Sequence, residues 1–156
     1  MPRKKRSIKE LLKSSNHLHY EFWMFNSLVN GLASGIAGQG PLLNALLESF
    51  VIHLRALIDF LYSDRPREDD VIAEDYFLNA DDWIKFRPEQ SEVLKLAKRR
   101  AGKEIAHLTY ARLDVTAETK PWPFVEIANE INAVFNIFLQ KMNKELLGSQ
   151  WNPLKM

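Results

Sequence analysis

The stretch LLNALLESFVIHLRALIDFLY, residues 42–62, decides the fold of this chain. Its apolar residues recur at intervals of three and four, which is the spacing of one helical face: Leu43, Leu46, Leu47, Phe50, Leu54, Leu57, Ile58 and Leu61. Val51, Ile52 and Phe60 add apolar groups on other faces. We therefore expect a central helix, buried on more than one side, that begins near Pro41 and ends before Ser63.

Three further segments have the same helical period. The first begins at Ser7, where Ser7 and Glu10 have the spacing of a capping box, and it continues to Leu32. The others run from about Pro88 to Leu113 and from Phe124 to a C-terminal cap at Gly148. The glycine-rich residues 31–41 read as a link, and no alternating strand pattern of useful length is present. The sequence predicts an all-α protein, an up-and-down four-helix bundle.

Residues 64–90 lack a clear period and form an irregular insert between the second and third predicted helices. We expect Trp83 and Phe86 to pin this insert to the bundle. The 156 residues favour one domain, with a basic N-terminal tail at 1–6, the bundle at 7–148 and a C-terminal tail at 149–156. The basic tail leaves 17 basic against 20 acidic residues elsewhere, and it reads either as a phosphate-contacting arm or as a solvated terminus.

The composition excludes several kinds of site. The chain has no cysteine, so disulfides, thiolate metal sites and cysteine nucleophiles are absent. No apolar run has the length of a signal peptide or of a membrane span, so we expect a soluble cytoplasmic protein with no membrane partner. No phosphate loop, nucleophile elbow or dinucleotide fingerprint appears, and we expect no cofactor.

The stretch KRRAGKEIAHLTYARL, residues 98–113, holds the first candidate site. Arg100 and His107 are seven positions apart, so on a helix they would share one face, with Lys103 between them. Neighbouring cations disfavour a protonated histidine, which leaves a neutral imidazole available as a base. In the competing interpretation, this is simply the solvated side of a helix with His107 at its edge.

A second polar group lies on the central helix, where Glu48, Arg55 and Asp59 follow one another at intervals of seven and four. Arg55 and Asp59 can pair within the helix, and a charged stripe on an enclosed helix needs a partner, a cleft or an interface. His53 belongs to an apolar face and is expected to be a hydrogen-bonded core residue. The sequence favours no metal site, although histidines from different helices could still form one.

The segment from Arg100 to His107 resembles the Arg-x(4–6)-His motif of HEPN domains, the higher-eukaryote and prokaryote nucleotide-binding superfamily. The order of two long helices, an insert, the motif helix and a final helix is also similar to that family. Ala101 stands where the family often has a polar residue after the arginine.

The resemblance implies metal-independent RNA cleavage in a toxin–antitoxin or phage-defence system, by a homodimer whose two motifs form one cleft. His107 would be the base and Arg100 the charge stabiliser, with Glu48 or Asp59 orienting the pair. An antitoxin or another partner protein would belong to such a system. Many members of the family are non-catalytic, so the second hypothesis is a helical interaction or dimerisation module that uses the polar stripe as its interface.

Overall fold

The structure, a computed structural model, describes residues 3–152, and every regular element in that range is helical. Five α-helices occur there: α1 (Ile8–Ala33), α2 (Pro41–Tyr62), α3 (Ala80–Phe86), α4 (Glu92–Arg100) and α5 (Phe124–Lys141). A π-helical turn covers Ala101–Ala106, and short 3-10 turns cover Ala73–Tyr76, Tyr110–Asp114, Lys144–Leu146 and Ser149–Trp151. The predicted all-α class is confirmed for these residues.

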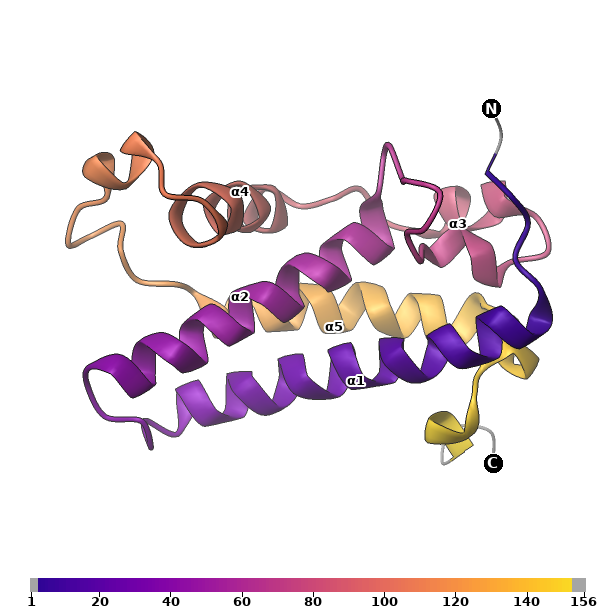
Figure 1. The fold of residues 1–156 in the computed structure, drawn as a ribbon, viewed down its shortest axis with the longest axis horizontal. Coiled ribbons are helices and arrows are strands. Elements are labelled where there is room, and N and C mark those ends of the chain that lie inside the picture. The colour runs from indigo at the N-terminus through magenta and orange to yellow at the C-terminus, as the bar shows by residue number, and fades with distance from the viewer. Residues whose placement is uncertain (1–2, 153–156) are drawn as a thin grey trace.

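The three long helices α1, α2 and α5 extend along the long axis of the molecule, whereas α4 is seen nearly end-on (Figure 1). α1 and α2 run in opposite directions and pack against each other. The turn between them contains Gly35, Gly38 and Gly40, all with positive φ, a conformation that costs glycine little. Within the described residues, three helices thus lie lengthwise and a fourth crosses them, which differs from the predicted up-and-down arrangement.

The capping box predicted at the start of α1 is confirmed. The Ser7 hydroxyl accepts a hydrogen bond from the Glu10 N–H at 3.3 Å, and the Glu10 carboxylate accepts one from the Ser7 N–H at 2.8 Å. These hydrogen bonds from Ser7 stabilise the charged carboxylate and lower the pKa of Glu10 below its ordinary value. The first turn of a 26-residue helix is therefore held by local side chains.

The core is centred on the second half of α2. Its side chains from Phe50 to Tyr62 supply most of the buried residues of this helix, and aromatic rings of α1 and α5 pack around them: Phe25, Phe135 and Phe138 are fully buried. The first half of α2 is different, because Leu42 is 60% exposed and no residue before Phe50 is buried. The prediction of burial on several sides is confirmed for the second half and wrong for the first, where no side chain is fully buried.

The insert is fastened to the end of α2 through Trp83. This side chain is fully buried, and its indole N–H donates to the Leu61 carbonyl at 2.9 Å, while Arg87 donates to the same carbonyl at 3.1 Å. Trp83 is therefore the predicted pin, and Phe86 contributes less because it is 44% exposed. Close by, Glu74 is buried with its nearest cation, Arg87, at 3.9 Å, and burial raises the pKa of its carboxyl above the ordinary 4.5.

The basic segment at the N-terminus packs on the insert. Arg3 forms an ion pair with Asp75 at 3.2 Å and donates to the carbonyls of Arg67 and Asp70. Arg6 lies 3.8 Å from the Glu68 carboxylate. Residues 3–6 are thus attached to the domain by charge pairing rather than forming the predicted free tail, and residues 1–2 lie outside the described part of the chain.

The C-terminal segment is also part of the domain. α5 ends at Lys141, seven residues before Gly148, so the predicted cap at Gly148 is wrong. The Gly148 N–H instead donates to the Ser15 hydroxyl at 2.7 Å, and the Trp151 indole donates to the Ser15 carbonyl at 2.7 Å. Trp151 is buried, so the core extends beyond the predicted boundary at 148; residues 153–156 lie outside the described chain.

By length and hydropathy alone, α2 is the one helix within residues 3–152 that could cross a membrane. A core helix of a globular protein meets the same two criteria. In this structure the second half of α2 packs into the bundle, and its exposed side carries Arg55 and Asp59.

Candidate functional site

The helix that carries the Arg-x6-His motif ends within the motif. α4 begins at Glu92, after the Ser91 N-cap, and stops at Arg100; the chain then makes the wider π-helical turn, and His107 has extended backbone angles. Side chains satisfy the carbonyls of this last turn: Thr109 donates to the Lys103 carbonyl at 2.8 Å and Arg112 to the His107 carbonyl at 3.1 Å. The helix predicted over 88–113 is therefore confirmed only for residues 92–106, and because His107 lies beyond its end, Arg100 and His107 do not share a helical face.

Arg100 is fully engaged by its neighbours. Its Nε and Nη2 donate to the two carboxylate oxygens of Glu104 at 2.8 and 2.9 Å, while Nη1 and Nη2 donate to the carbonyls of Pro121 and Lys120, both at 3.1 Å. The guanidinium also lies over the Trp122 ring, 4.3 Å from its centroid. With only 12% of its side chain exposed, Arg100 anchors the 116–123 loop against the end of α4.

His107, in contrast, is exposed. Its backbone is held by Arg112, whose Nη2 also lies 3.4 Å from the Ile105 carbonyl, so a guanidinium and an imidazole are attached to the same short loop. Lys103 is exposed as well, and its carbonyl is the one that Thr109 binds. The structure thus leaves three basic side chains exposed, Lys103 on the π-helical turn and His107 and Arg112 on the residues that follow it, while Arg100 is engaged by Glu104 and the loop carbonyls.

The polar stripe of α2 divides between two pockets. Glu48 lines a small pocket of about 230 Å³ together with Glu104, Arg112 and Trp122. Arg55 and Asp59 pair within the helix as predicted, with Arg55 Nε and Asp59 Oδ2 3.7 Å apart, and they line a larger pocket.

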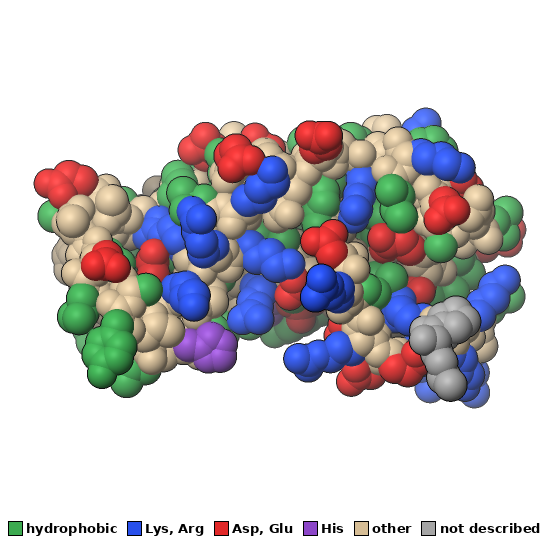
Figure 2. Space-filling view, turned by 90° about the horizontal axis from the view of Figure 1, so that it is seen from above, with side chains coloured by type: hydrophobic (Ala, Val, Ile, Leu, Met, Phe, Trp, Pro, Cys, Tyr) green, Lys and Arg blue, Asp and Glu red, His purple; other side chains and the backbone are tan. Residues whose placement is uncertain are grey.

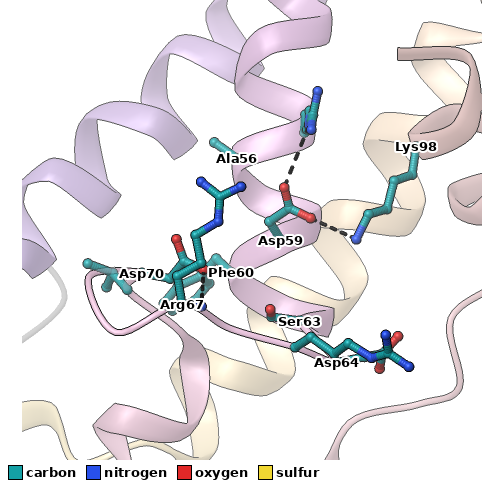
Figure 3. Close-up of a pocket in the computed structure, with 11 residues that line it drawn as sticks. Ala56, Asp59, Phe60, Ser63, Asp64, Arg67, Asp70 and Lys98 are labelled. Atoms are coloured by element: carbon teal, nitrogen blue, oxygen red, sulfur yellow. Dashed lines mark hydrogen bonds and ion pairs between the residues drawn. The ribbon is translucent and has the colours of Figure 1, made fainter. Parts of the chain in front are cut away.

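We call this larger space the α2–α4 pocket; it has a volume of about 810 Å³ and lies between α2, α4 and the loop that follows α2 (Figure 3). Its lining comprises Arg55, Ala56, Asp59, Phe60, Ser63, Asp64, Arg65, Arg67, Asp70, Val71 and Lys98. Figure 3 shows Asp59 at its centre, and this carboxylate forms ion pairs with Lys98 of α4 and with Arg55 of α2. The stripe was expected to need a partner, a cleft or an interface because an enclosed helix would bury it; Arg55 and Asp59 are instead nearly half exposed, and Asp59 also pairs with Lys98 at 2.7 Å.

Two of the histidines have side-chain partners within the domain. His53 is buried, as expected, and its Nδ1 lies 2.6 Å from the Glu21 carboxylate. His19 packs edge-on against Trp151, with ring centroids 4.9 Å apart. Within residues 3–152, no three histidine, aspartate or glutamate side chains are placed to hold an ion.

Several site residues were not predicted. The pairing of Arg100 with Glu104 was visible as an i,i+4 spacing, and the same rule identified Arg55 and Asp59. Trp122 and Arg112 lie next to Arg100 and His107 because the segment 107–123 folds back on the end of α4. Arg65 and Arg67 line the α2–α4 pocket because the insert begins beside it. Neither arrangement follows from a spacing in the sequence.

Basic side chains gather across the middle of the face that carries α4, with a histidine at the edge of this group (Figure 2). The exposed basic residues of α4 and of residues 101–113 are Lys95, Arg99, Lys103 and Arg112. The whole chain has a net charge of only +1, and acidic side chains surround this basic cluster on the same face (Figure 2).

Comparison of the chain with known protein families, with curated proteins and with solved structures finds no match in any of the three.

Proposed function

We propose that this protein is an RNA-directed, HEPN-like protein that contacts RNA with the basic face of α4 and residues 101–113. The observation that supports this proposal best is the exposed imidazole of His107, which directly follows the helical turn that carries Lys103 and whose carbonyl accepts a hydrogen bond from Arg112. Lysine and arginine side chains bind phosphate groups regardless of base sequence. An exposed imidazole beside such a surface is suited to act on a ribose that the surface holds.

The reaction that fits these groups is metal-independent strand cleavage. A ring nitrogen of His107 takes the proton of a ribose 2′-hydroxyl, and the 2′-oxygen attacks the adjacent phosphorus. The bond from phosphorus to the 5′-oxygen breaks, the 5′-oxygen takes up a proton, and a 2′,3′-cyclic phosphate forms. Because the donors of Arg100 are used by Glu104 and by backbone carbonyls, we assign the stabilisation of charge on the phosphate to Lys103 and to Nε and Nη1 of Arg112, whose Nη2 donates to the carbonyls of Ile105 and His107.

The test compares RNA cleavage in the presence of EDTA by the wild type and by His107→Ala. Removal of a general base lowers the rate by about 10²–10⁴-fold, so we expect the variant to be nearly inactive while it keeps the wild-type unfolding curve. His17→Ala, which changes an exposed histidine of α1, is the matched control and should cleave like the wild type. Equal cleavage by the wild type and by His107→Ala, or products without a 2′,3′-cyclic phosphate, would contradict the proposed chemistry.

A second candidate function, a dimerisation module, rests on a different observation. Leu108 and Tyr110 are each 90% exposed and Leu113 is 81% exposed, all within six residues. Apolar side chains that cluster on a surface are typical of protein interfaces. We propose that a second copy of the chain covers them, which would bring two His107 loops close together.

Sedimentation equilibrium tests this assembly. We expect a dimer for the wild type and a monomer for the double variant Leu108→Ser/Leu113→Ser, whose exposed side chains contribute little to the fold of one copy. A double variant of equally exposed residues elsewhere, Ile36→Ser/Leu78→Ser, should stay dimeric. A monomeric wild type at about 100 μM would argue against the module, since a specific interface of standard size binds more tightly than this.

A further inference from the structure

The α2–α4 pocket contains more cationic side chains than its own carboxylates neutralise. Four basic residues line it, Arg55, Arg65, Arg67 and Lys98, against the three acids Asp59, Asp64 and Asp70. They come from three parts of the chain, namely α2, the loop after it, and α4. Cations that converge from separate segments on one space are costly to hold together unless an anion lies between them.

Asp59 acts as that anion in the described structure. Its Oδ1 lies 2.7 Å from Lys98 Nζ and its Oδ2 lies 3.7 Å from Arg55 Nε, so one carboxylate bridges two cations on different helices. The Asp59 side chain is 47% exposed and faces the pocket (Figure 3). A bridge of this kind is weak in water, and a stronger anion could take over both cations.

Arg65 and Arg67 have no such partner. Within residues 3–152, neither guanidinium forms a hydrogen bond or an ion pair, although both line the pocket. The backbone of Arg67 is held on both sides, because its N–H donates to Asp70 Oδ2 at 2.7 Å and its carbonyl accepts from Arg3 Nε at 3.1 Å. Figure 3 shows its side chain extending from the loop towards Ala56, beside Asp59. The planar guanidinium, with its forked donors, matches a phosphate group.

We propose that the α2–α4 pocket binds a phosphomonoester carried on a ribose. Arg67 and Arg65 hold the phosphate, and Lys98 and Arg55 turn to it from Asp59. A volume of about 810 Å³ suits a nucleotide better than a bare ion, and Ser63 and Asp64 offer acceptors for sugar hydroxyls. This site is separate from His107 and requires no cleavage there. Its ligand could be a free mononucleotide or the 5′ end of an RNA strand, since both carry the same group.

Binding is measured at 50 mM salt with three probes: AMP by calorimetry, and by fluorescence anisotropy a hexaribonucleotide with either a 5′-phosphate or a 5′-hydroxyl, 2′-O-methylated so that it has no 2′-hydroxyl through which it can be cleaved. We expect the 5′-phosphate to bind more tightly than the 5′-hydroxyl. If AMP binds as well, the source is a free nucleotide; if only the phosphorylated oligonucleotide binds, the source is a strand end. The proposal fails if neither AMP nor the 5′-phosphate adds any affinity.

The variants distinguish specific binding in the α2–α4 pocket from nonspecific attraction by the positive charge of the surface. Arg67→Ala should weaken binding of the 5′-phosphate about tenfold or more, since it removes a charged hydrogen-bonding group. Arg99→Ala removes an exposed cation of α4 that does not line the pocket, and it should have little effect. Asp59→Asn should tighten binding several-fold, because it frees Lys98 and Arg55 and removes a negative charge.

Equal losses in Arg67→Ala and Arg99→Ala, or weaker binding by Asp59→Asn, would overturn the proposal. His107→Ala should bind the 5′-phosphate like the wild type. Failure of the proposed cleavage at His107 would therefore appear in the cleavage assay, and failure of the proposed pocket would appear in the binding assay. All variants change exposed or half-exposed side chains, and their unfolding curves confirm that the fold is kept.

Discussion

Replacement of Arg100 by alanine should destabilise the domain before it affects any chemistry. In the structure its guanidinium donates to both oxygens of Glu104, to two carbonyls of the following loop and lies over Trp122. The variant Arg100→Ala loses all these contacts together. It also leaves the Glu104 carboxylate, which is 19% exposed, with no cation to pair with at this position.

The size of the effect follows from these contacts. A hydrogen bond that involves a charged group contributes about 1.5–3 kcal/mol, and a cation over an aromatic ring adds about 0.5–2 kcal/mol. These contributions are not additive, and the loop carbonyls can turn to water, so we expect a loss of about 2–3 kcal/mol of unfolding free energy. The Arg55–Asp59 pair has the same i,i+4 spacing but is nearly half exposed, and its loss should cost about 0.5 kcal/mol or less.

Urea unfolding followed by circular dichroism measures this loss. With a slope of about 1–3 kcal/mol per molar urea, Arg100→Ala should unfold at roughly 0.7–3 M lower urea than the wild type. Arg99→Ala, which changes the exposed neighbour, should unfold like the wild type. Limited proteolysis should show earlier cleavage within residues 116–121 in Arg100→Ala only, because Arg100 holds the carbonyls of Lys120 and Pro121.

The variant Arg100→Lys tests the geometry, since a lysine keeps the charge but cannot donate to both oxygens of Glu104 and to the loop at the same time. We expect it to recover less than half of the lost stability. The reasoning is refuted if Arg100→Ala unfolds within about 0.5 kcal/mol of the wild type. If such a stable variant also lost RNA cleavage, Arg100 would be a catalytic residue, as the sequence first suggested.

Three further predictions concern stability and ionisation. Gly148→Ala should lose about 1–3 kcal/mol of unfolding free energy in urea, because the new Cβ would lie 2.5 Å from the Leu12 carbonyl and also meet the Asn16 side chain. The control Gly102→Ala adds a Cβ that meets nothing within 4 Å and should stabilise the turn slightly; similar effects of the two variants would contradict this. Burial raises the pKa of the Glu74 carboxyl, so this group contributes most to stability below pH 4.5, and its contribution falls as the pH rises towards its pKa in the folded protein. The unfolding free energy of Glu74→Gln should therefore rise relative to that of the wild type between pH 4.5 and 7.5. A difference that stays constant over this range would refute the reasoning. Burial also raises the pKa of Tyr76 to about 12, so difference ultraviolet titration of the native protein should show one tyrosine ionising near that value and lost in Tyr76→Phe.

The sequence predicted well those features that depend on neighbours along the chain. The helix at 41–62, the capping box of Ser7 and Glu10 and the Arg55–Asp59 pair all arise from interactions within one or two turns. The burial of His53 followed from its place on an apolar helical face. Each of these could be predicted because helical geometry fixes which side chains meet.

The motif helix was mispredicted because its end depends on distant residues. The apolar period of residues 94–108 continues past Arg100, and the one local sign of a helix end within it is Gly102, which follows the basic residues 98–100. In the structure, Arg112 and Thr109 bind the carbonyls of the last turn, and Trp122 packs under Arg100. These contacts bridge between five and 22 positions, beyond the reach of a helical repeat.

The sequence by itself determined the all-α class, the central helix and the residue types available for chemistry, because helical period and composition are local properties. Only the tertiary structure decided which of those residues are free to act. In the folded chain, Arg100 donates to Glu104 and to the carbonyls of the following loop, whereas His107 is exposed. Arg67 and Lys98, which are far apart in the sequence, line the same pocket as Asp59. The physical reason is that the availability of a charged group depends on its partners in space, and most of these partners lie far away in the chain.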